Sequence, residues 1–252
     1  MGCLRQFGAM IFARLAAASP YYETYWDLIE GNGATSFYKF DETSGSTATD
    51  SGSNGVDGTY YNTPTLNQAG PSTEIPSAVS FNNASSETMY TAEVADFNVN
   101  ANSNWSAECW IRYSDTGTTI MGLYGIRQLS GDDATLFVLA ANFSVAGRIT
   151  LFVRLAASTY LTLHDDGGWN DDDWHHVAVT AVSGGAVKLY VDGVEKASST
   201  STRVSNTSNR RIYVGSNPAF ASQYFSGLIT APAYYPSTLS ATEVNDHYLK
   251  GA

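Results

Sequence analysis

The sequence is poor in charge, and the charge that it carries is mostly negative. Only 15% of the 252 residues are charged, and 13 Lys and Arg stand against 24 Asp and Glu, for a formal net charge of −11. A protein that binds nucleic acid through its phosphates, or that adheres to anionic lipid, needs a positive surface. The shortage of basic residues therefore argues against a nucleic-acid or membrane partner, whereas clustered carboxylates would suit a hard cation.

Cysteine and long apolar runs are also scarce. The sequence has two cysteines, and neither Cys3 nor Cys109 has the spacing of a metal site or a disulfide framework. Cys109 stands in an apolar stretch, so we expect a buried free thiol. No run of about 18 apolar residues is present, so no transmembrane helix is predicted. The apolar run at 7–18 is short and contains Arg14, which argues against a cleaved signal peptide.

Aromatic and turn-forming residues, by contrast, are plentiful. Aromatics make up 13% of the sequence, and Tyr alone numbers 16. Short period-two runs separated by Gly, Asn, Asp and Ser are typical of an all-β protein. The clearest run spans 105–112, and alternation assigns one of its faces to the core. That face carries Trp105, Ala107, Cys109 and Ile111.

A hairpin pattern gives the firmest local prediction of topology. His175 to Ala181 leads through two glycines into Val187 to Val191, and Asp192-Gly193 then predicts a tight primed turn into a third strand. Further strands are predicted at 37–40, 78–81, 118–124, 135–140, 148–153, 211–215 and 225–229. A short helical turn is expected after Leu239.

Residues 1–33 follow a different pattern from residues 34–252. Ser19-Pro20 resembles a helix start, apolar residues then recur at helical spacing, and Gly31-Asn32-Gly33 ends the run. We interpret 1–33 as a partly helical N-terminal arm and 34–252 as one β-sandwich. The arm's apolar side chains are predicted to contact other protein chains; the alternative is that they pack on the arm's own sandwich. The predicted interface residues are Phe7, Ile11, Leu15, Tyr21, Tyr25 and Leu28.

Several segments, taken in order, resemble one known family. They are Phe37 to Glu42, Asp50 to Thr59, Val79 to Asn82, Trp105 to Arg112, Trp174 to Thr180, Val187 to Gly193 and Tyr213 to Gly215. Together they resemble the laminin G-like and pentraxin-like branch of the concanavalin A-like lectin/glucanase superfamily, over roughly residues 35–250. The resemblance implies an all-β, two-sheet antiparallel jelly-roll sandwich, here with a short N-terminal helical arm. Residues 20–60 are also similar to domains of tailed-phage virion proteins.

The loop from Asp50 to Asp57 is the candidate metal site. Asp50, Asn54 and Asp57 offer hard oxygens along a glycine-rich turn, and calcium takes six to eight such ligands. In relatives a calcium commonly lies near this loop and is completed by an acidic residue after the last strand. Here Thr230 stands at that place, so the alternative is a turn whose side chains cap its own backbone. Calcium is the only cofactor that we consider.

Exposed aromatic residues are the candidate glycan ligands, because aromatic faces stack on sugar rings. We single out Tyr60, Tyr61 and Trp169. Trp169 stands between two acidic stretches, which could hold a cation but are more simply a solvated loop. His175 and His176 follow one another on a strand, so they point to opposite faces and cannot share one metal ion.

The residues that catalysis would need are missing. The glucanase branch of the family uses a Glu-x-Asp-x-x-Glu pattern on one strand, and Glu93 and Asp96 do not match it. No Gly-x-Ser-x-Gly elbow, phosphate-binding loop or His-Glu-x-x-His occurs. We therefore expect a protein that is not an enzyme.

The leading hypothesis is a virion structural protein, such as a capsid decoration, spike or minor tail protein. It would display a lectin-like module at the surface of a phage particle, bind other virion proteins through the arm and attach to a host glycan. A homo-oligomer would be compatible with such a role. The alternative is a secreted or cell-surface lectin module, and a glycoside hydrolase is the least favoured reading.

Overall fold

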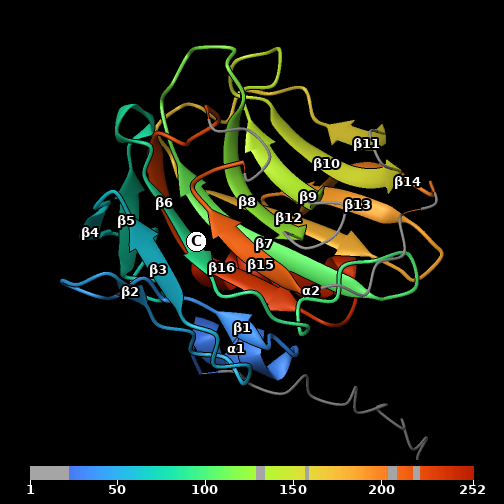
Figure 1. Ribbon diagram of the computed structural model, residues 1–252, viewed down its shortest axis with the longest axis horizontal. Helices are drawn as coiled ribbons and strands as arrows, with labels where there is room; N and C mark the ends of the chain where they lie inside the picture. Colours follow the sequence, from blue (N-terminus) through green and yellow to red (C-terminus); the bar gives the residue numbers. More distant parts are fainter. Residues whose placement is uncertain (1–22, 129–133, 157–158, 202, 204–208, 218–221) are drawn as a thin grey trace, which may run out of the picture.

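Two antiparallel β-sheets packed face to face form the protein (Figure 1). The computed structural model describes residues 23–128, 134–156, 159–201, 203, 209–217 and 222–252. Each sheet has eight strands, and the strands are joined by crossovers from one sheet to the other. The predicted all-β jelly-roll sandwich of the concanavalin A-like kind is confirmed.

The first sheet, here called the helix-packed sheet, lies beneath both α-helices. Its strands in spatial order are β14 (Val194–Ser199), β13 (Val187–Val191), β12 (His175–Ala181), β7 (Trp105–Arg112), β16 (Gly227–Tyr235), β5 (Ser77–Phe81) and β4 (Thr65–Ala69), with β1 (Ser36–Phe37) paired to β16. The outer face of its central strands is apolar, so this face requires a cover of its own.

The other sheet is called the second sheet. Its strands in spatial order are β11 (Thr159–His164), β10 (Ile149–Ala156), β9 (Ala134–Ala141), β8 (Met121–Gln128), β15 (Arg210–Val214), β6 (Thr88–Thr91), β3 (Gly58–Tyr61) and β2 (Thr47–Ala48). The helices are α1 (Tyr25–Gly31), α2 (Ala241–Gly251) and the 3₁₀ turn η1 (Asn83–Ser85). Among the described residues, no helix is long and apolar enough to cross a membrane.

The core between the sheets is built by period-two alternation. Trp105, Ala107, Cys109 and Ile111 on β7 all point into it and are fully buried, as predicted. In register on the neighbouring strand, Val177 of β12 lies opposite Cys109. The predicted primed turn is present too, since Asp192 and Gly193 both have positive φ, of 50° and 73°.

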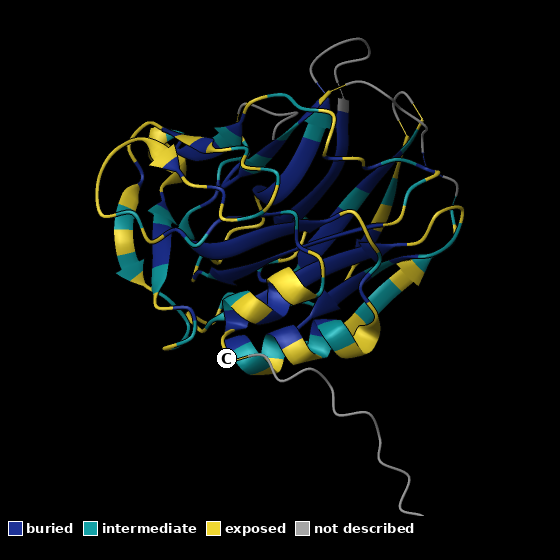
Figure 2. Cartoon of the chain, turned by 90° about the horizontal axis from the view of Figure 1, so that it is seen from below, coloured by how far each residue is buried: buried dark blue, intermediate teal, exposed yellow. Residues whose placement is uncertain are grey.

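The two helices cover the outer face of the helix-packed sheet (Figure 2). Tyr25 and Ile29 of α1 are fully buried there, and they join a cluster with Trp110 of β7, Tyr235 of β16 and Val244 of α2. The exposed residues of both helices lie on the side away from the sheet (Figure 2).

This packing corrects the predicted role of two arm residues. Tyr25 and Leu28 are buried by the protein's own fold, so neither is exposed for contact with another chain. The physical reason is that the sandwich has an apolar outer face as well as an inner core, and α1 fills part of that face. Helix α1 begins at Tyr25 behind a Thr24 capping box, after the start predicted at Ser19-Pro20. Four other predicted interface residues, Phe7, Ile11, Leu15 and Tyr21, lie outside the described residues, as does the predicted helix start.

A buried carboxylate ties α2 to the sheet. The side chain of Glu108 points away from the core of the sandwich and is fully buried beneath the helices. It accepts a hydrogen bond of 2.6 Å from the Tyr235 hydroxyl, and it contacts His176 Nε2 at 3.1 Å and His247 Nδ1 at 3.0 Å. Burial raises the pKa of Glu108, but the charges and hydrogen bonds of His247 and His176 outweigh it and hold this pKa well below its usual range.

Candidate functional site

The loop predicted to bind calcium is held by hydrogen bonds to its own backbone. One Asp50 carboxylate oxygen accepts from the backbone N–H of Phe37 at 3.0 Å and of Gly52 at 2.9 Å. The other oxygen accepts from the N–H of Val56 at 2.9 Å, and Asp57 accepts from the N–H of Asp50 at 2.9 Å. These contacts are those of a capped turn, in which the carboxylates satisfy backbone donors.

The third residue of the predicted metal site is hydrogen-bonded to two hydroxyl groups. Asn54 donates through its side-chain nitrogen to the hydroxyls of Thr35 at 3.2 Å and Ser36 at 3.0 Å. In the part of the chain that the structure describes, no three Asp, Glu, His or Cys side chains are grouped as metal ligands. The geometry favours the turn interpretation, and calcium binding stays a prediction that calcium titration can test.

The two adjacent tyrosines of β3 have opposite environments. Tyr60 faces the core, is 6% exposed and donates its hydroxyl to Glu42 at 2.9 Å, so it has no free face for a sugar ring. This corrects its predicted role, because a strand sends neighbouring side chains to opposite faces. Tyr61 faces outward, is 39% exposed and stacks on Tyr90 of β6 with ring centroids 4.1 Å apart.

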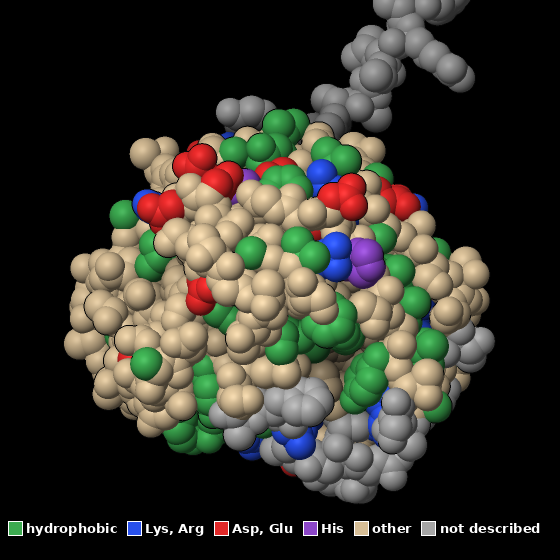
Figure 3. All heavy atoms as spheres, turned by 90° about the horizontal axis from the view of Figure 1, so that it is seen from above, with side chains coloured by type: hydrophobic (Ala, Val, Ile, Leu, Met, Phe, Trp, Pro, Cys, Tyr) green, Lys and Arg blue, Asp and Glu red, His purple; other side chains and the backbone are tan. Residues whose placement is uncertain are grey.

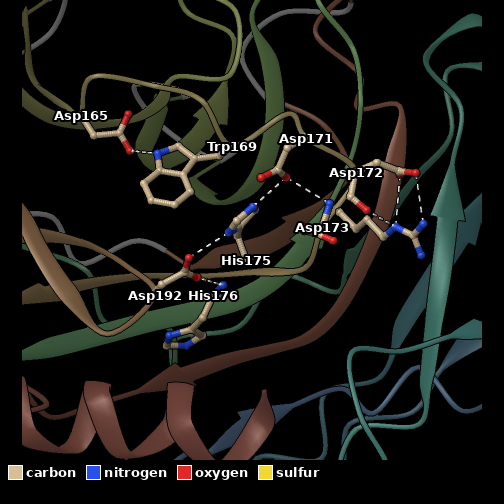
Figure 4. A network of polar contacts seen from close by, with 9 residues as sticks. Asp165, Trp169, Asp171, Asp172, Asp173, His175, His176 and Asp192 are labelled. Atoms are coloured by element: carbon tan, nitrogen blue, oxygen red, sulfur yellow. Dashed lines mark hydrogen bonds and ion pairs between the residues drawn. The ribbon is translucent and has the colours of Figure 1, made fainter.

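Trp169 lies in the acidic loop between β11 and β12, and its indole ring is held on several sides (Figure 4). Its N–H donates to Asp165, its ring meets His175 edge to face at 4.9 Å, and Lys196 Nζ lies 4.9 Å from the ring centroid. The loop leaves β11, one edge of the second sheet, whereas Tyr61 is on β3 near the other edge. The predicted glycan residues therefore do not form one site.

The aspartates of this loop are divided among separate partners (Figure 4). Asp165 accepts from Trp169, Asp171 contacts His175 Nε2 at 3.0 Å, and Asp172 pairs with Arg112 at 3.1 Å. Asp192, in the turn between β13 and β14, contacts the other ring nitrogen of His175, Nδ1, at 2.8 Å. Burial lowers the pKa of His175, but the hydrogen bonds to Asp192 and Asp171 outweigh it and raise the pKa overall. His176 lies on the opposite face, at Glu108, so the two histidines are separated as the strand geometry predicted.

An open cleft lies at the rim of the sandwich next to this loop. Seen from above, the molecule carries most of its visible acidic side chains toward one side (Figure 3). It has a volume of about 660 Å³, and its lining includes Arg112, Asp115, Asp172, Ser226 and Leu228. Arg112 donates to Asp172 through Nε and Nη2, at 3.2 and 3.1 Å. The one aromatic residue among the described lining residues, Tyr113, is 2% exposed. The cleft therefore offers polar groups but no ring for stacking.

A second hollow lies on the outer face of the second sheet, and here aromatic and polar groups occur together. Its volume is about 290 Å³. Phe143 and Phe152 meet edge to face with centroids 5.0 Å apart, and Tyr160 of the edge strand β11 is 38% exposed beside them. The remaining lining residues are Ile120, Thr135, Val138, Thr162, Asn217 and Gln223. We call this hollow the aromatic groove.

A buried polar atom in the wall of the aromatic groove has no partner among the described residues. Thr135 is 2% exposed, and its Oγ1 makes no hydrogen bond to any described residue. An unpartnered buried hydroxyl costs about 1–3 kcal/mol, and a ligand that bonds to it recovers this cost. Asn217 donates to Gln223 Oε1 at 2.6 Å on the same wall, so amide groups also border the groove.

The groove residues were not among those predicted to bind a ligand, although part of the signal is present in the sequence. Ile149, Leu151 and Val153 face the core, so alternation alone puts Phe152 on the outer face of β10. An aromatic residue at an outward strand position is the pattern that could have indicated the groove. The unpartnered hydroxyl of Thr135, by contrast, depends on its neighbours in space and leaves no trace in the sequence.

Comparison with protein families identifies the class of this domain. The family model described as the concanavalin A-like lectin/glucanases superfamily matches residues 85–245, which is more than half of the chain. The chain therefore belongs to this superfamily, and it is a lectin-like jelly-roll domain. Comparison with curated proteins gives no match.

Solved structures with the same fold include both binding domains and enzymes. The binding domain of botulinum neurotoxin serotype D has a TM-score of 0.65 and 16% identity, over 86% of this chain and 52% of that one. Domain 4 of AbnA, a GH43 extracellular arabinanase from Geobacillus stearothermophilus, solved with arabinotriose, has a TM-score of 0.65 and 21% identity, over 86% and 98%. Trypanosoma rangeli sialidase has a TM-score of 0.63 and 19% identity, over 86% and 32%.

These likenesses show the fold alone, because the identities are low. The chain spans about half the length of the neurotoxin domain, and about a third of the sialidase. It matches nearly the whole of the AbnA domain, so that domain is the comparison of similar size. Enzymatic activity is not established by any of them.

Proposed function

We propose that this domain binds an oligosaccharide in the aromatic groove on the outer face of the second sheet. The observation that carries the proposal is the groove itself, in which Phe152 and Tyr160 offer rings beside the unpartnered hydroxyl of Thr135. A sugar ring has apolar C–H faces that pack on aromatic rings and hydroxyls that need hydrogen-bond partners. Membership of the lectin-containing superfamily, and the arabinotriose complex of the AbnA domain, support this class of ligand.

We propose binding without hydrolysis. Glycoside cleavage uses two carboxyl groups on either side of the scissile bond. Among the described residues that line the aromatic groove, none is Asp or Glu. A glycan held there would meet hydroxyls, amides and rings but no acid–base pair. Incubating the protein with each bound oligosaccharide and analysing the products by mass spectrometry tests this, and release of shorter sugars would contradict it.

The binding proposal is tested first on an array of immobilised glycans and then by calorimetry with the best oligosaccharide. Phe152→Ala and Tyr160→Ala should each weaken binding at least about tenfold, since stacking on an aromatic ring is lost. Leu249→Ala is the matched control, because Leu249 is 63% exposed on α2, at the opposite sheet. If no glycan binds, or if both groove variants bind as tightly as the parent protein, the groove is not the site.

A finer proposal concerns where the module acts. We propose that it is displayed on the surface of a phage particle and is held there by residues before α1. The support is the arrangement of residues 20–60, which resembles domains found in tailed-phage virion proteins, together with the apolar residues Phe7, Ile11 and Leu15. The test is co-expression with the neighbouring genes of its source. The full chain should assemble with their products, and a chain that starts at residue 23 should remain free. Equal assembly of both chains would contradict the proposal, and the protein would then be considered as a secreted lectin.

A further inference from the structure

The second sheet has a charge opposite to that of the whole protein. Its eight strands, all within the described residues, contain no Asp or Glu, yet they contain four arginines. Those arginines are Arg127, Arg154, Arg210 and Arg211. The chain as a whole carries a formal net charge of −11. The strands of this sheet therefore contribute basic side chains and no acidic ones, on a protein that is acidic as a whole.

Two of the arginines lie side by side on the outer face. Arg211 of β15 is paired in register with Arg127 of β8, and residues paired in this way share one face of a sheet. Alternation gives the direction, because Ile212 and Val214 face the core and so Arg211 and Tyr213 face outward. The two guanidinium groups therefore add their positive potential at one place on this face.

Arg211 is held in place by a row of tyrosines. Its guanidinium carbon lies 4.6 Å from the centroid of the Tyr90 ring, and Tyr61 stacks on the same ring at 4.1 Å. One face of a ring holds only one group at such a distance, so Tyr61 and Arg211 lie on opposite faces of Tyr90. Tyr213 completes the row at 5.5 Å from Tyr90. We call these four residues the tyrosine–arginine patch.

The patch has the parts that a carboxylate-bearing sugar requires. Arg211 is partly exposed, but its Nε is enclosed by the protein and makes no hydrogen bond to any described residue, so a ligand would meet the terminal nitrogens of the guanidinium. A guanidinium fork binds a carboxylate in bidentate fashion, and stacking on Tyr90 fixes the plane of the fork in advance. Tyr61, which is 39% exposed, offers a ring against which the sugar can pack.

The patch and the aromatic groove lie on one continuous face. The strand order β10-β9-β8-β15 puts Tyr213 three strand spacings from Phe152, and Arg211 lies two residues further along β15, so Phe152 and Arg211 are about 16 Å apart. Between them stand Val138 of β9 and Gly125 of β8, which lie in register with Phe152. Gly125 has no side chain and Val138 is 2% exposed, so neither position puts an exposed side chain between the groove and the patch.

The geometry points to an acidic glycan as the ligand: one sugar lies in the aromatic groove, and a sugar a few residues along the same chain presents its carboxylate to Arg211. This inference rests on the proposed groove and adds the class of sugar. The carboxylate has two sources among glycans, a hexuronic acid within a polymer or a sialic acid at a chain end. Both present the same anion, so the experiment must distinguish them.

Calorimetry with three defined probes separates the cases: trigalacturonic acid, sialyllactose and the neutral trisaccharide arabinotriose. At low salt, at least one acidic probe should bind at least about tenfold more tightly than arabinotriose. Because the added attraction is electrostatic, 0.5 M NaCl should remove much of that preference. Tight binding of trigalacturonic acid alone assigns an internal uronate, and tight binding of sialyllactose alone assigns a terminal sialic acid.

The variants test the patch itself. Arg211→Gln should weaken binding of the preferred acidic probe at least about tenfold and binding of the neutral probe less than twofold. Arg211→Lys keeps the charge but not the planar fork, so its affinity for the acidic probe should lie between those of the parent protein and Arg211→Gln. Arg112→Gln at the rim cleft is the matched control and should change neither. Melting curves confirm that each variant is folded.

The possible failures can be told apart. If arabinotriose binds as tightly as both acidic probes and Arg211→Gln is silent, the acidic inference is overturned and the groove stands. If no saccharide binds at all, both proposals fail. Phe152→Ala could abolish binding of every probe while Arg211→Gln weakens the binding of acidic and neutral probes equally. In that case Arg211 stabilises the structure of the sheet and does not recognise a carboxylate.

Discussion

Replacement of the buried Glu108 by Gln is predicted to cost more stability than any change to an exposed ion pair. Gln has the same size, but it replaces a carboxylate that takes contacts from Tyr235, His176 and His247 at 2.6, 3.1 and 3.0 Å. An amide has one oxygen acceptor and an NH₂ group that donates, so it cannot serve all three donors.

The magnitude follows from the burial of the group. Glu108 and both histidines have fully buried side chains, and breaking a buried pair by removing one partner costs about 3–5 kcal/mol. For a chain of this size, each kcal/mol corresponds to a melting shift of about 2–4 °C. We therefore expect Glu108→Gln to lower the melting temperature by about 6–20 °C.

The assay is thermal and urea unfolding followed by circular dichroism, with Glu195→Gln as control. Glu195 lies on β14 of the same sheet and pairs with Lys188 at 2.8 Å, but both side chains are more than a third exposed. Such a surface pair contributes less than about 1 kcal/mol. If Glu108→Gln lowers stability no more than Glu195→Gln does, the buried network does not hold α2 to the sheet.

Low pH should destabilise the folded protein by protonating the same carboxylate, that of Glu108. Because the pKa of Glu108 is lower in the folded protein than its ordinary value of 4.5, its contribution is fully present above that value. The contribution is then lost as the pH falls through and below 4.5 toward the folded-state pKa. Unfolding free energies measured from pH 6 down to pH 3 should therefore fall more steeply for the parent protein than for Glu108→Gln, and parallel curves would contradict the assignment.

Four further predictions test other parts of the structure. Deleting residues 1–22 should leave a folded sandwich, whereas deleting 1–31 removes the buried Tyr25 and Ile29 and should cost at least about 3–6 kcal/mol in urea unfolding. Asp50→Ala removes the acceptor of the backbone amides of Phe37, Gly52 and Val56 and should lower the free energy of unfolding by at least about 2 kcal/mol. If calcium binds to this loop, calcium added after chelation should raise the melting temperature of the parent protein. An unchanged melting curve would favour the turn alone. The pKa of His175 is raised in the folded state, so its contribution is present below about pH 6.5 and lost as the pH rises through the folded value; an NMR titration should place that value above 6.5. Burial raises the pKa of Cys109, so peptide mapping should find this thiol alkylated by iodoacetamide only after unfolding.

The elements that the sequence predicts best are those whose two faces differ. On β7 the alternation separates the core residues from Glu108 and Trp110. In the hairpin, the pair Asp192-Gly193 strongly favours a tight primed turn. Strand β4 was not predicted, because Thr65–Ala69 has exposed and half-buried residues and no buried one, so its pattern resembles a loop. Strand β6 was missed for the opposite reason, since Thr88–Thr91 is mostly buried and has no clean alternation.

The N-terminal helix shows where reasoning from periodicity fails. The spacing correctly predicted a helix that ends near Gly31, but not the surface that it covers. That surface is formed by Trp110, Ala178 and Tyr235, on strands far apart in the sequence. Their outward positions are apolar, which is typical of a sheet buried on both faces, and this was the signal that α1 would pack on its own sandwich.

The distribution of charge explains how an acidic protein could present a site for an acidic glycan. The helix-packed sheet is closed by α1 and α2, so its outer face cannot receive a ligand unless Glu108 and its partners are exposed. The second sheet keeps Tyr61 and Tyr160 more than a third exposed, and its strands carry arginines without acids. At physiological salt, charges more than about 8 Å apart are largely screened from one another. A carboxylate above Arg211 would therefore experience mainly Arg211 and its register partner Arg127, and not the distant aspartates that make the whole protein negative.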